Sequence, residues 1–333
     1  MSLILAALAG AVTAPSLPAP ARVEVAPGRS IALTCVGGGP QTILFDAGGS
    51  DWSLVWATIL PRLAGRARAC AYDRAGLGAS DPAPGARTPM AIVEDLHSLI
   101  EAARLKGSLI LVGHSLGGFN VKLYTALYPD DVAGLVLVDP SEERDWDRTR
   151  AWAIKKYGAV TTTRAELLDR SFIAGLMERY RRCATISQPN GLDPASLDYR
   201  RCSDPPRPAL GDQINAGRQK VQATATYQAA QASEILNSVY GGNQSDEAYA
   251  QLFRPGMFGA KPLVVLTHVE EPSTDPVDQL GAEQGLRLHD ETARLSLRGR
   301  HQPVRNSGHY IQLDQPEVLL QAIGGALDQL KKD

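Results

Sequence analysis

An apolar run that ends in a tight, glycine-flanked serine turn constrains this chain more than any other stretch. Residues 109–112 are apolar and strand-like, the sequence Gly113-His114-Ser115-Leu116-Gly117 follows, and residues 119–128 have helical spacing. A strand, a G-x-S-x-G turn and a helix in this order are typical of a nucleophile elbow with serine at its apex. Glycines are needed on both sides of the serine because the strand and helix backbones approach closely there. The stretch therefore predicts that Ser115 projects over the sheet edge as a nucleophile, beside the positive end of a helix.

Strand-like and helical runs alternate on both sides of this elbow. Strands are expected at 22–25, 30–36, 41–45, 67–72, 109–112, 134–138, 262–267 and 301–305. Helices are expected at 52–63, 90–105, 119–128, 278–297 and 316–330. Apolar strands that alternate with helices predict a mostly parallel α/β sheet covered on both faces.

The alternation stops at residue 140 and resumes near residue 260. Between them the chain is polar, has no strand-like run, and shows helical stretches near 145–157, 164–182 and 212–239. We therefore expect one sheet domain, residues 22–140 and 260–333, that is split by a mainly helical insertion at 141–259.

Composition limits the possible partners. The chain has 333 residues, 44% of them hydrophobic, and a formal charge of −2, which by itself predicts neither nucleic acid nor an anionic membrane as a partner. The basic cluster 179–182 and the charged run 141–145 are interpreted as solvated surface. Past the N-terminus, no run approaches the roughly 18 apolar residues of a membrane span. Nothing in the sequence indicates an oligomeric state.

The N-terminal 21 residues differ from the rest of the chain. Residues 3–12 are apolar, and a small-residue, proline-rich stretch follows, as in a secretory signal peptide, although no Lys or Arg precedes them. Residues 1–21 are therefore expected to be a leader or its remnant. We favour a secreted or periplasmic protein, with a cytoplasmic one as the alternative.

The four cysteines fit export. Cys183 and Cys202 lie 19 apart in an irregular region where a disulfide can replace a missing core, so we expect them to pair. Cys35 and Cys70 each lie in an apolar strand-like run, where free buried cysteines are equally expected. The chain lacks C-x-x-C or Cys/His spacing that predicts a metal site.

A serine hydroxyl needs a neighbouring imidazole to take its proton. His309 alone among six histidines follows a late strand in a glycine-containing loop, where parallel strands present side chains at one sheet edge. The other five fit less well: His97 and His289 fall in helices, His301 begins a strand, His114 lies inside the elbow, and His268 is expected at the pocket mouth. His309 is the predicted general base.

Four pieces in order resemble the α/β-hydrolase superfamily, in particular its esterase-like branch with a helical cap. They are residues 46–50, 72–80, 113–118 and 307–309, and the resemblance covers about 22–140 and 260–333. It implies an eight-stranded, mostly parallel sheet, a cap after Asp139, and Ser115 as nucleophile. The strand order of that superfamily also makes Cys35 and Cys70 neighbours that could pair.

A tetrahedral intermediate needs preorganised donors for its oxyanion. One is expected from the N–H of Leu116, at the start of the elbow helix. The other is expected from the N–H of Gly49, in the loop after the 41–45 strand, where many relatives have His-Gly and this chain has Ala47-Gly48. The predicted substrate pocket is lined by Trp52, His114 and His268, although Trp52 fits a core position equally well.

The acid that orients His309 has more than one candidate. It must be ionised, largely buried, and within hydrogen-bond reach of the imidazole Nδ1. The superfamily places it either after the strand that follows the cap or after the strand that follows the elbow helix. The second position is Asp139, our first choice. The first position offers Glu271, and after it Glu270 or Asp275, because the usual glycine-containing turn with aspartate is absent.

These features predict a serine hydrolase that cleaves an ester-like acyl substrate through an acyl-Ser115 intermediate, without metal or cofactor. Amide, thioester, lactone or C–C bond hydrolysis would use the same residues, so the substrate stays open. The alternatives are an acyltransferase or peptidase with the same triad, or a non-hydrolytic binding protein on the same fold.

Overall fold

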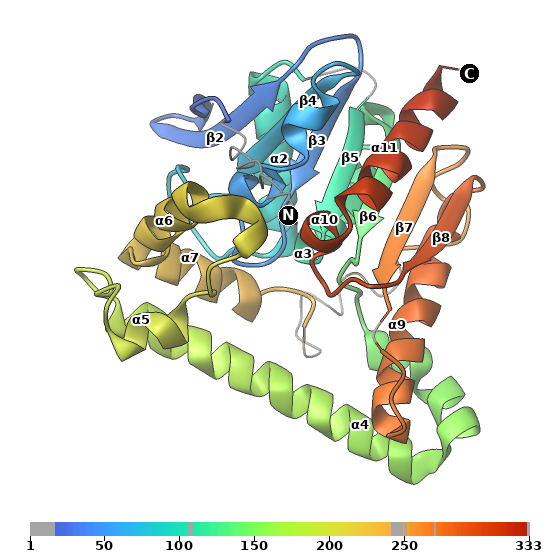
Figure 1. The fold of residues 1–333 in the computed structure, drawn as a ribbon. Coiled ribbons are helices and arrows are strands. Elements are labelled where there is room, and N and C mark those ends of the chain that lie inside the picture. The colour runs from blue at the N-terminus through green and yellow to red at the C-terminus, as the bar shows by residue number, and fades with distance from the viewer. Residues whose placement is uncertain (1–16, 106–108, 241–248, 250–251, 270, 332–333) are drawn as a thin grey trace, which may run out of the picture.

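The computed structural model describes residues 17–105, 109–240, 249, 252–269 and 271–331. Its centre is a twisted eight-stranded sheet (Figure 1). The strands are β1 (Ala21–Ala26), β2 (Arg29–Val36), β3 (Thr42–Asp46), β4 (Arg68–Asp73), β5 (Leu109–His114), β6 (Val132–Val138), β7 (Leu263–His268) and β8 (Gly299–Val304). They are ordered β1-β2-β4-β3-β5-β6-β7-β8. β2 runs antiparallel to β1 and β4, and the remaining pairs are parallel, as the sequence predicts.

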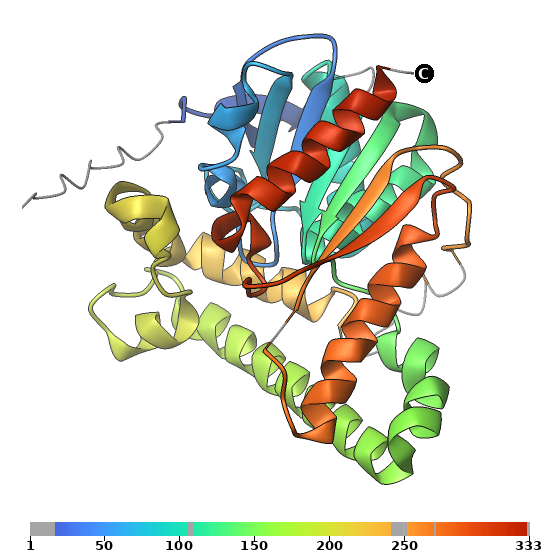
Figure 2. The ribbon, with the colours of Figure 1, turned by 45° about the vertical axis from the view of Figure 1, so that its right-hand side comes forward.

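Helices cover both faces of this sheet. One core lies between the sheet and α2 (Pro89–Ala102), α3 (Leu116–Leu127) and the end of α9 (Pro276–Ala293). The other lies under α1 (Leu60–Leu63) and α11 (Pro316–Leu330), and Figure 2 shows α11 crossing that face. A short helix, α10 (Ile311–Asp314), precedes α11, and a 3₁₀ turn, η2 (Pro129–Asp131), precedes β6. Two-sided cover explains why the central strands are apolar throughout.

The expected continuous helix at 52–63 is wrong. The structure has a 3₁₀ turn, η1 (Ser53–Trp56), and then the short helix α1. Pro61 lies in the first turn of α1, where its missing N–H is tolerated, so a helix begins there but cannot run through from before it. The apolar residues that suggested one helix are nevertheless buried.

Among the described residues between β6 and β7, the chain forms helices and no strand. These are α4 (Asp145–Ile186), α5 (Leu197–Cys202), the 3₁₀ turn η3 (Pro208–Leu210), α6 (Gly211–Gln222) and α7 (Ala225–Leu236). The expected helices at 145–157 and 164–182 are two arms of α4, which meet at a kink where Gly158 has a φ of 82°. The expected stretch 212–239 is divided in two, because Thr224 caps the start of α7 through its side chain. We call residues 139–262 the β6–β7 segment.

Two disulfides cross-link the fold. Cys183 is bonded to Cys202, which joins the end of α4 to α5, as the sequence predicts. Cys35 is bonded to Cys70 across the paired strands β2 and β4, so of the two possibilities for these cysteines the structure contains the pair. None of the described helices is both long and apolar enough to cross a membrane. The expected leader lies mostly outside the described residues.

Candidate active site

The elbow between β5 and α3 holds Ser115 in a backbone conformation that side chains rarely adopt. Ser115 has a φ of 51° and a ψ of −122°, directly before the first residue of α3. A Cβ at Gly113 would lie 2.4 Å from the carbonyl oxygen of Gly117, and a Cβ at Gly117 would lie 2.3 Å from that of Ala47. Only glycine fits at both positions, which lets the strand and helix backbones approach this closely around Ser115.

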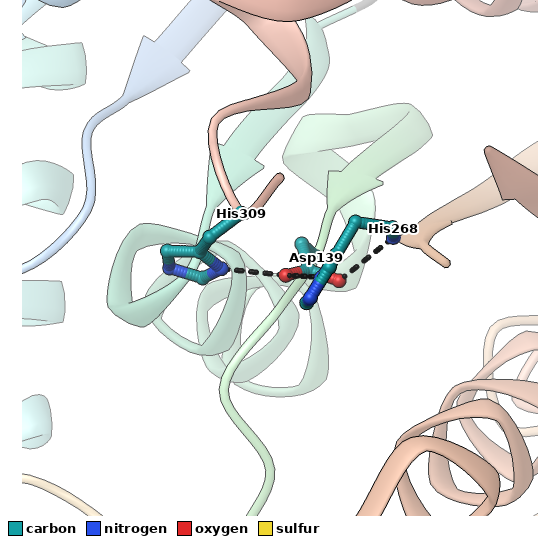
Figure 3. Close-up of side chains that lie close together, drawn as sticks. All are labelled: Asp139, His268 and His309. Atoms are coloured by element: carbon teal, nitrogen blue, oxygen red, sulfur yellow. Dashed lines mark hydrogen bonds and ion pairs between the residues drawn. The ribbon is translucent and has the colours of Figure 1, made fainter. Parts of the chain in front are cut away.

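The ends of β6 and β8 bring an acid and an imidazole together. Asp139 follows β6, and His309 lies in the loop after β8. The Nδ1–H of His309 donates to Oδ2 of Asp139 over 2.5 Å (Figure 3). Since Nδ1 carries the proton of the neutral ring, Nε2 is left as the acceptor that a general base requires.

A second histidine binds the same carboxylate. The Nδ1–H of His268, at the end of β7, donates to Oδ2 of Asp139 over 2.6 Å, and the backbone N–H of His268 donates to Oδ1 over 3.2 Å. Figure 3 shows Asp139 between the two imidazoles. The sequence places His268 at the pocket mouth and offers no sign that it contacts the acid.

The hydrogen bonds keep Asp139 ionised. Burial alone would raise its pKa, but the donors from His268 and His309 outweigh burial and hold the pKa well below its usual range. The three side chains also offer ligand atoms within 4.8 Å of one another, the kind of set that can bind a metal ion. Here, however, each imidazole directs its Nδ1–H at the carboxylate, so the three groups satisfy one another as hydrogen-bond partners.

The alternative acids have other surroundings. Glu271 is exposed and lines a shallow pocket with Ser307 and Gly308. Asp275 caps α9 by accepting the backbone N–H of Val277 over 2.8 Å. Glu270 lies outside the described residues. The carboxylate in contact with His309 is thus that of Asp139.

His114 supports the backbone of His309. Its Nε2–H donates to the carbonyl oxygen of His309 over 2.9 Å, and the two rings lie 4.6 Å apart. Burial, and the repulsion from His309 when that ring is protonated, lower the pKa of His114 to about 3, so the His114 ring is neutral at physiological pH. His114, predicted to line the pocket, thus holds the loop that carries His309.

The loop after β3 lies beside Ser115. A Cβ at Gly48 would lie 3.3 Å from Cβ of Ser115, and one at Gly49 would lie 3.8 Å from Cδ2 of Leu116. Among the described residues, the backbone N–H groups of Gly49 and Leu116 have no hydrogen-bond acceptor. Two neighbouring free donors next to a serine are what an oxyanion hole requires.

A buried ion network holds this loop. Arg74 donates to the carbonyl oxygens of Ala47 and Gly48 over 2.6 and 2.7 Å. It also pairs with Asp46 and Glu234, each at 2.6 Å.

Glu234, in α7, binds a second cation, Arg87, at 2.5 Å. Burial would raise the pKa of Glu234, but Arg74 and Arg87 lower it to about 2. The network therefore ties the β6–β7 segment to the loop beside Ser115. The sequence does not predict this role of Glu234, because no local motif marks it and its partner Arg74 lies 160 residues away.

Tyr240 contacts Ser141, whose backbone N–H donates to the carbonyl oxygen of Ser115 over 2.9 Å. Its hydroxyl lies 2.8 Å from Oγ of Ser141. Burial raises the pKa of Tyr240, while hydrogen bonds with the Ser141 and Ser115 side chains oppose that rise. Tyr240 also lines a cavity of about 470 Å³, together with Pro140 and His289. The sequence contains no motif that would have identified Tyr240.

Trp52, expected to line the pocket, is buried against the β6–β7 segment instead. Its ring centroid lies 5.7 Å from that of Tyr227 in α7, and the Arg218 guanidinium of α6 lies 4.9 Å from it. These contacts favour the core position that the sequence left open. Trp52 thereby packs against both α6 and α7.

Comparison with known proteins agrees with this architecture. A model described as the alpha/beta hydrolase family matches residues 35–322. A (lyso)-N-acylphosphatidylethanolamine lipase of Homo sapiens is 36% identical over 89 residues, which are 26% of this chain and 26% of the human protein. The segments matched in the first curated relatives span between 16% and 40% of the length of those proteins.

Solved structures show the same fold. An esterase from Thermogutta terrifontis is 19% identical, with a TM-score of 0.57 over 93% of this chain and 98% of the esterase. A putative epoxide hydrolase from Pseudomonas aeruginosa is also 19% identical, with a TM-score of 0.65 over 96% of this chain and 99% of that one. Similarity at this level of identity concerns the fold and leaves the reaction to the site residues.

Proposed function

Because the chain belongs to the alpha/beta hydrolase family, we propose that it is a serine hydrolase that cleaves an ester-like acyl substrate through an acyl-Ser115 intermediate. The observation that carries the proposal is the hydrogen bond of 2.5 Å between Asp139 and His309, at the sheet edge where the elbow presents Ser115. An ionised acid that orients an imidazole next to a serine is the arrangement of an acyl-transfer triad.

The reaction follows from these positions. Oγ of Ser115 attacks the substrate carbonyl carbon while Nε2 of His309 takes the hydroxyl proton. The negative charge of Asp139 stabilises the resulting imidazolium, and the N–H groups of Gly49 and Leu116 stabilise the oxyanion. The imidazolium then protonates the leaving group, which departs. Water, deprotonated by the same imidazole, attacks the acyl-serine ester and releases the carboxylic acid.

A hydroxyl nucleophile favours acyl chemistry over the epoxide opening named in one structural neighbour. A serine that opened an epoxide would form an ether, which has no carbonyl for water to attack, so the enzyme would not turn over. The acyl-serine ester of the proposed reaction is hydrolysed by the same site that forms it.

We place substrate selection in the β6–β7 segment, acting as a cap. The cavity beside Tyr240 is lined by side chains of α4 and α9, and the Tyr240 hydroxyl contacts Ser141, whose backbone N–H donates to the carbonyl oxygen of Ser115. This cavity is the proposed place for one part of the substrate. We also propose that the protein is exported to an oxidising compartment, because disulfides such as its two persist there.

A fluorophosphonate probe and p-nitrophenyl esters of rising chain length test the proposal. We expect the probe to add to Ser115, and Ser115→Ala and His309→Ala to lower kcat by about 10⁴-fold or more with the fold intact. Ser307→Ala is the matched control, because the Ser307 hydroxyl is near His309 in sequence but bonds the Gly308 carbonyl. A Ser115→Ala variant that kept its turnover would refute the serine mechanism. Folded wild-type protein that neither reacted with the probe nor cleaved any ester would favour the binding-protein alternative.

A further inference from the structure

The long helix α4 exposes apolar side chains on its outward side. We call Val160, Leu167, Leu168 and Phe172 the α4 outer face. Their exposed fractions are 86%, 58%, 53% and 67%. Val160 and Leu167 lie on one side of the helix and Leu168 and Phe172 flank them, while Thr162 and Tyr180 of the opposite side are buried. Such a cluster of exposed large apolar residues on a helix marks an interaction surface.

The charge of α4 differs from that of the whole chain. Residues 150–182 carry several exposed cations. Besides Arg150 there are seven: Lys155, Lys156, Arg164, Arg170, Arg179, Arg181 and Arg182. Over the same residues the one exposed acid is Glu178. Acids of neighbouring segments pair with three of these cations: Glu283 with Lys156, Asp275 with Arg164, and Asp198 with Arg182. The formal charge of −2 for the entire chain hides this local excess. The basic cluster 179–182, interpreted from the sequence as solvated surface, continues the α4 outer face.

Helix α4 lies beyond the carboxyl ends of the strands, at the edge where the active site is built (Figure 1). Its inner side reaches that site, since the Tyr180 hydroxyl lies 3.3 Å from Oγ of Ser50, next to Gly49. A surface that bound the α4 outer face would therefore lie on the same side of the molecule as Ser115.

We propose that the α4 outer face docks the protein onto an anionic lipid surface. A helix with apolar side chains on one side and basic residues around them inserts those side chains at the level of the headgroups, while the cations bind anionic lipid. Arg164 lies in the same shallow groove as Val160 and Leu167, so a cation sits directly among the inserting side chains. The proposal concerns binding and does not depend on the proposed reaction.

The size of the patch favours lipid over a folded protein partner. A stable protein interface needs about 20–30 residues on each side. The α4 outer face offers four large apolar side chains on one helix, with basic residues between them. Insertion among lipid headgroups needs no more than one such helix face.

Co-sedimentation of the full chain, disulfides intact, with large unilamellar vesicles tests the docking. Vesicles of pure phosphatidylcholine are compared with vesicles that contain about 30% phosphatidylglycerol. We expect binding to the anionic vesicles that weakens with salt. The triple variant Leu167→Ser/Leu168→Ser/Phe172→Ser and the double variant Arg164→Glu/Arg182→Glu should each lower the partition coefficient by about 10-fold or more.

Matched controls separate the possible outcomes. Leu297 is 78% exposed on another part of the surface, so Leu297→Ser should bind vesicles like the wild type. Ser115→Ala should also bind like the wild type, which keeps this test separate from the test of the reaction. Circular dichroism checks that every variant is folded. Absence of vesicle binding, or equal binding by the triple variant, overturns the proposal. A wild-type dimer that the triple variant converts to a monomer, seen by light scattering, assigns the face to a second copy and also overturns it.

Discussion

Replacing Asp139 by asparagine removes the charge that would stabilise the His309 imidazolium in the proposed reaction, and it disrupts the hydrogen bonds around that carboxylate. Oδ2 accepts from both imidazoles, and Oδ1 accepts the backbone N–H of His268. Whichever way the asparagine amide is turned, its NH₂ faces a donor, either the two Nδ1–H groups or the backbone N–H. The variant therefore loses both the charge and the orientation of the ring.

The size of the effect follows from the burial of the two groups. The Asp139 side chain is 6% exposed, so its charge acts with little screening, whereas the His309 side chain is 43% exposed and partly in water. The loss for such an orienting acid is about 10⁴-fold in kcat, or about 5 kcal/mol of transition-state stabilisation. Because water screens part of the His309 ring, we expect between about 10³- and 10⁴-fold for Asp139→Asn.

Initial rates with a p-nitrophenyl ester measure this loss, with circular dichroism to check the fold. The kcat should fall while KM changes little, because the interaction is made in the transition state. Glu271→Gln is the matched control, since Glu271 is exposed, and its kcat should stay within about 3-fold of the wild type. A fully active Asp139→Asn beside an inactive Glu271→Gln would show that the orienting acid has been wrongly assigned.

Two further predictions concern stability. The pKa of Glu234 is about 2 in the folded protein, against an ordinary value of 4.5. The ionised carboxylate therefore contributes about 3 kcal/mol to the free energy of unfolding. This contribution is complete above pH 4.5 and is lost as the pH falls from 4.5 toward 2. Urea unfolding measures how much the free energy of unfolding falls between pH 7 and pH 3. This fall should be smaller in Glu234→Gln than in the wild type or in the exposed control Glu317→Gln. An equal fall in all three proteins would contradict the lowered pKa of Glu234. Closing the loop of about 20 residues between Cys183 and Cys202 should stabilise the fold by about 3 kcal/mol, measured against the Cys183→Ser/Cys202→Ser variant. Non-reduced digests in which either cysteine is a free thiol would contradict the disulfide.

Local rules explain what could be predicted from the sequence. The elbow depends on glycines whose missing Cβ atoms make room within a few residues of Ser115, and strand and helix periodicities are equally local. The alternation of strands and helices therefore predicts the sheet, and the interruption at residue 140 predicts the helical β6–β7 segment. Apolar spacing alone does not predict the break between η1 and α1, which depends on Pro61 in the first turn of α1.

The tertiary structure decided the contacts between distant segments. From the sequence, Asp139 and Glu271 both follow strands that end at the same sheet edge, and only the packed loops put the Asp139 carboxylate against His309 and His268. Glu234 reaches Arg74 across 160 residues, a pairing with no local signal.

The α4 outer face also could not be read from the sequence. Helix α4 carries large side chains on both of its sides, so periodicity cannot say which side meets the protein. Packing buries Tyr180 and leaves Leu167 and Phe172 in solvent. Short-range sterics thus determine the elements and the turn that carries Ser115, whereas the partners of each side chain depend on how strands and helices separated by a hundred residues or more pack together.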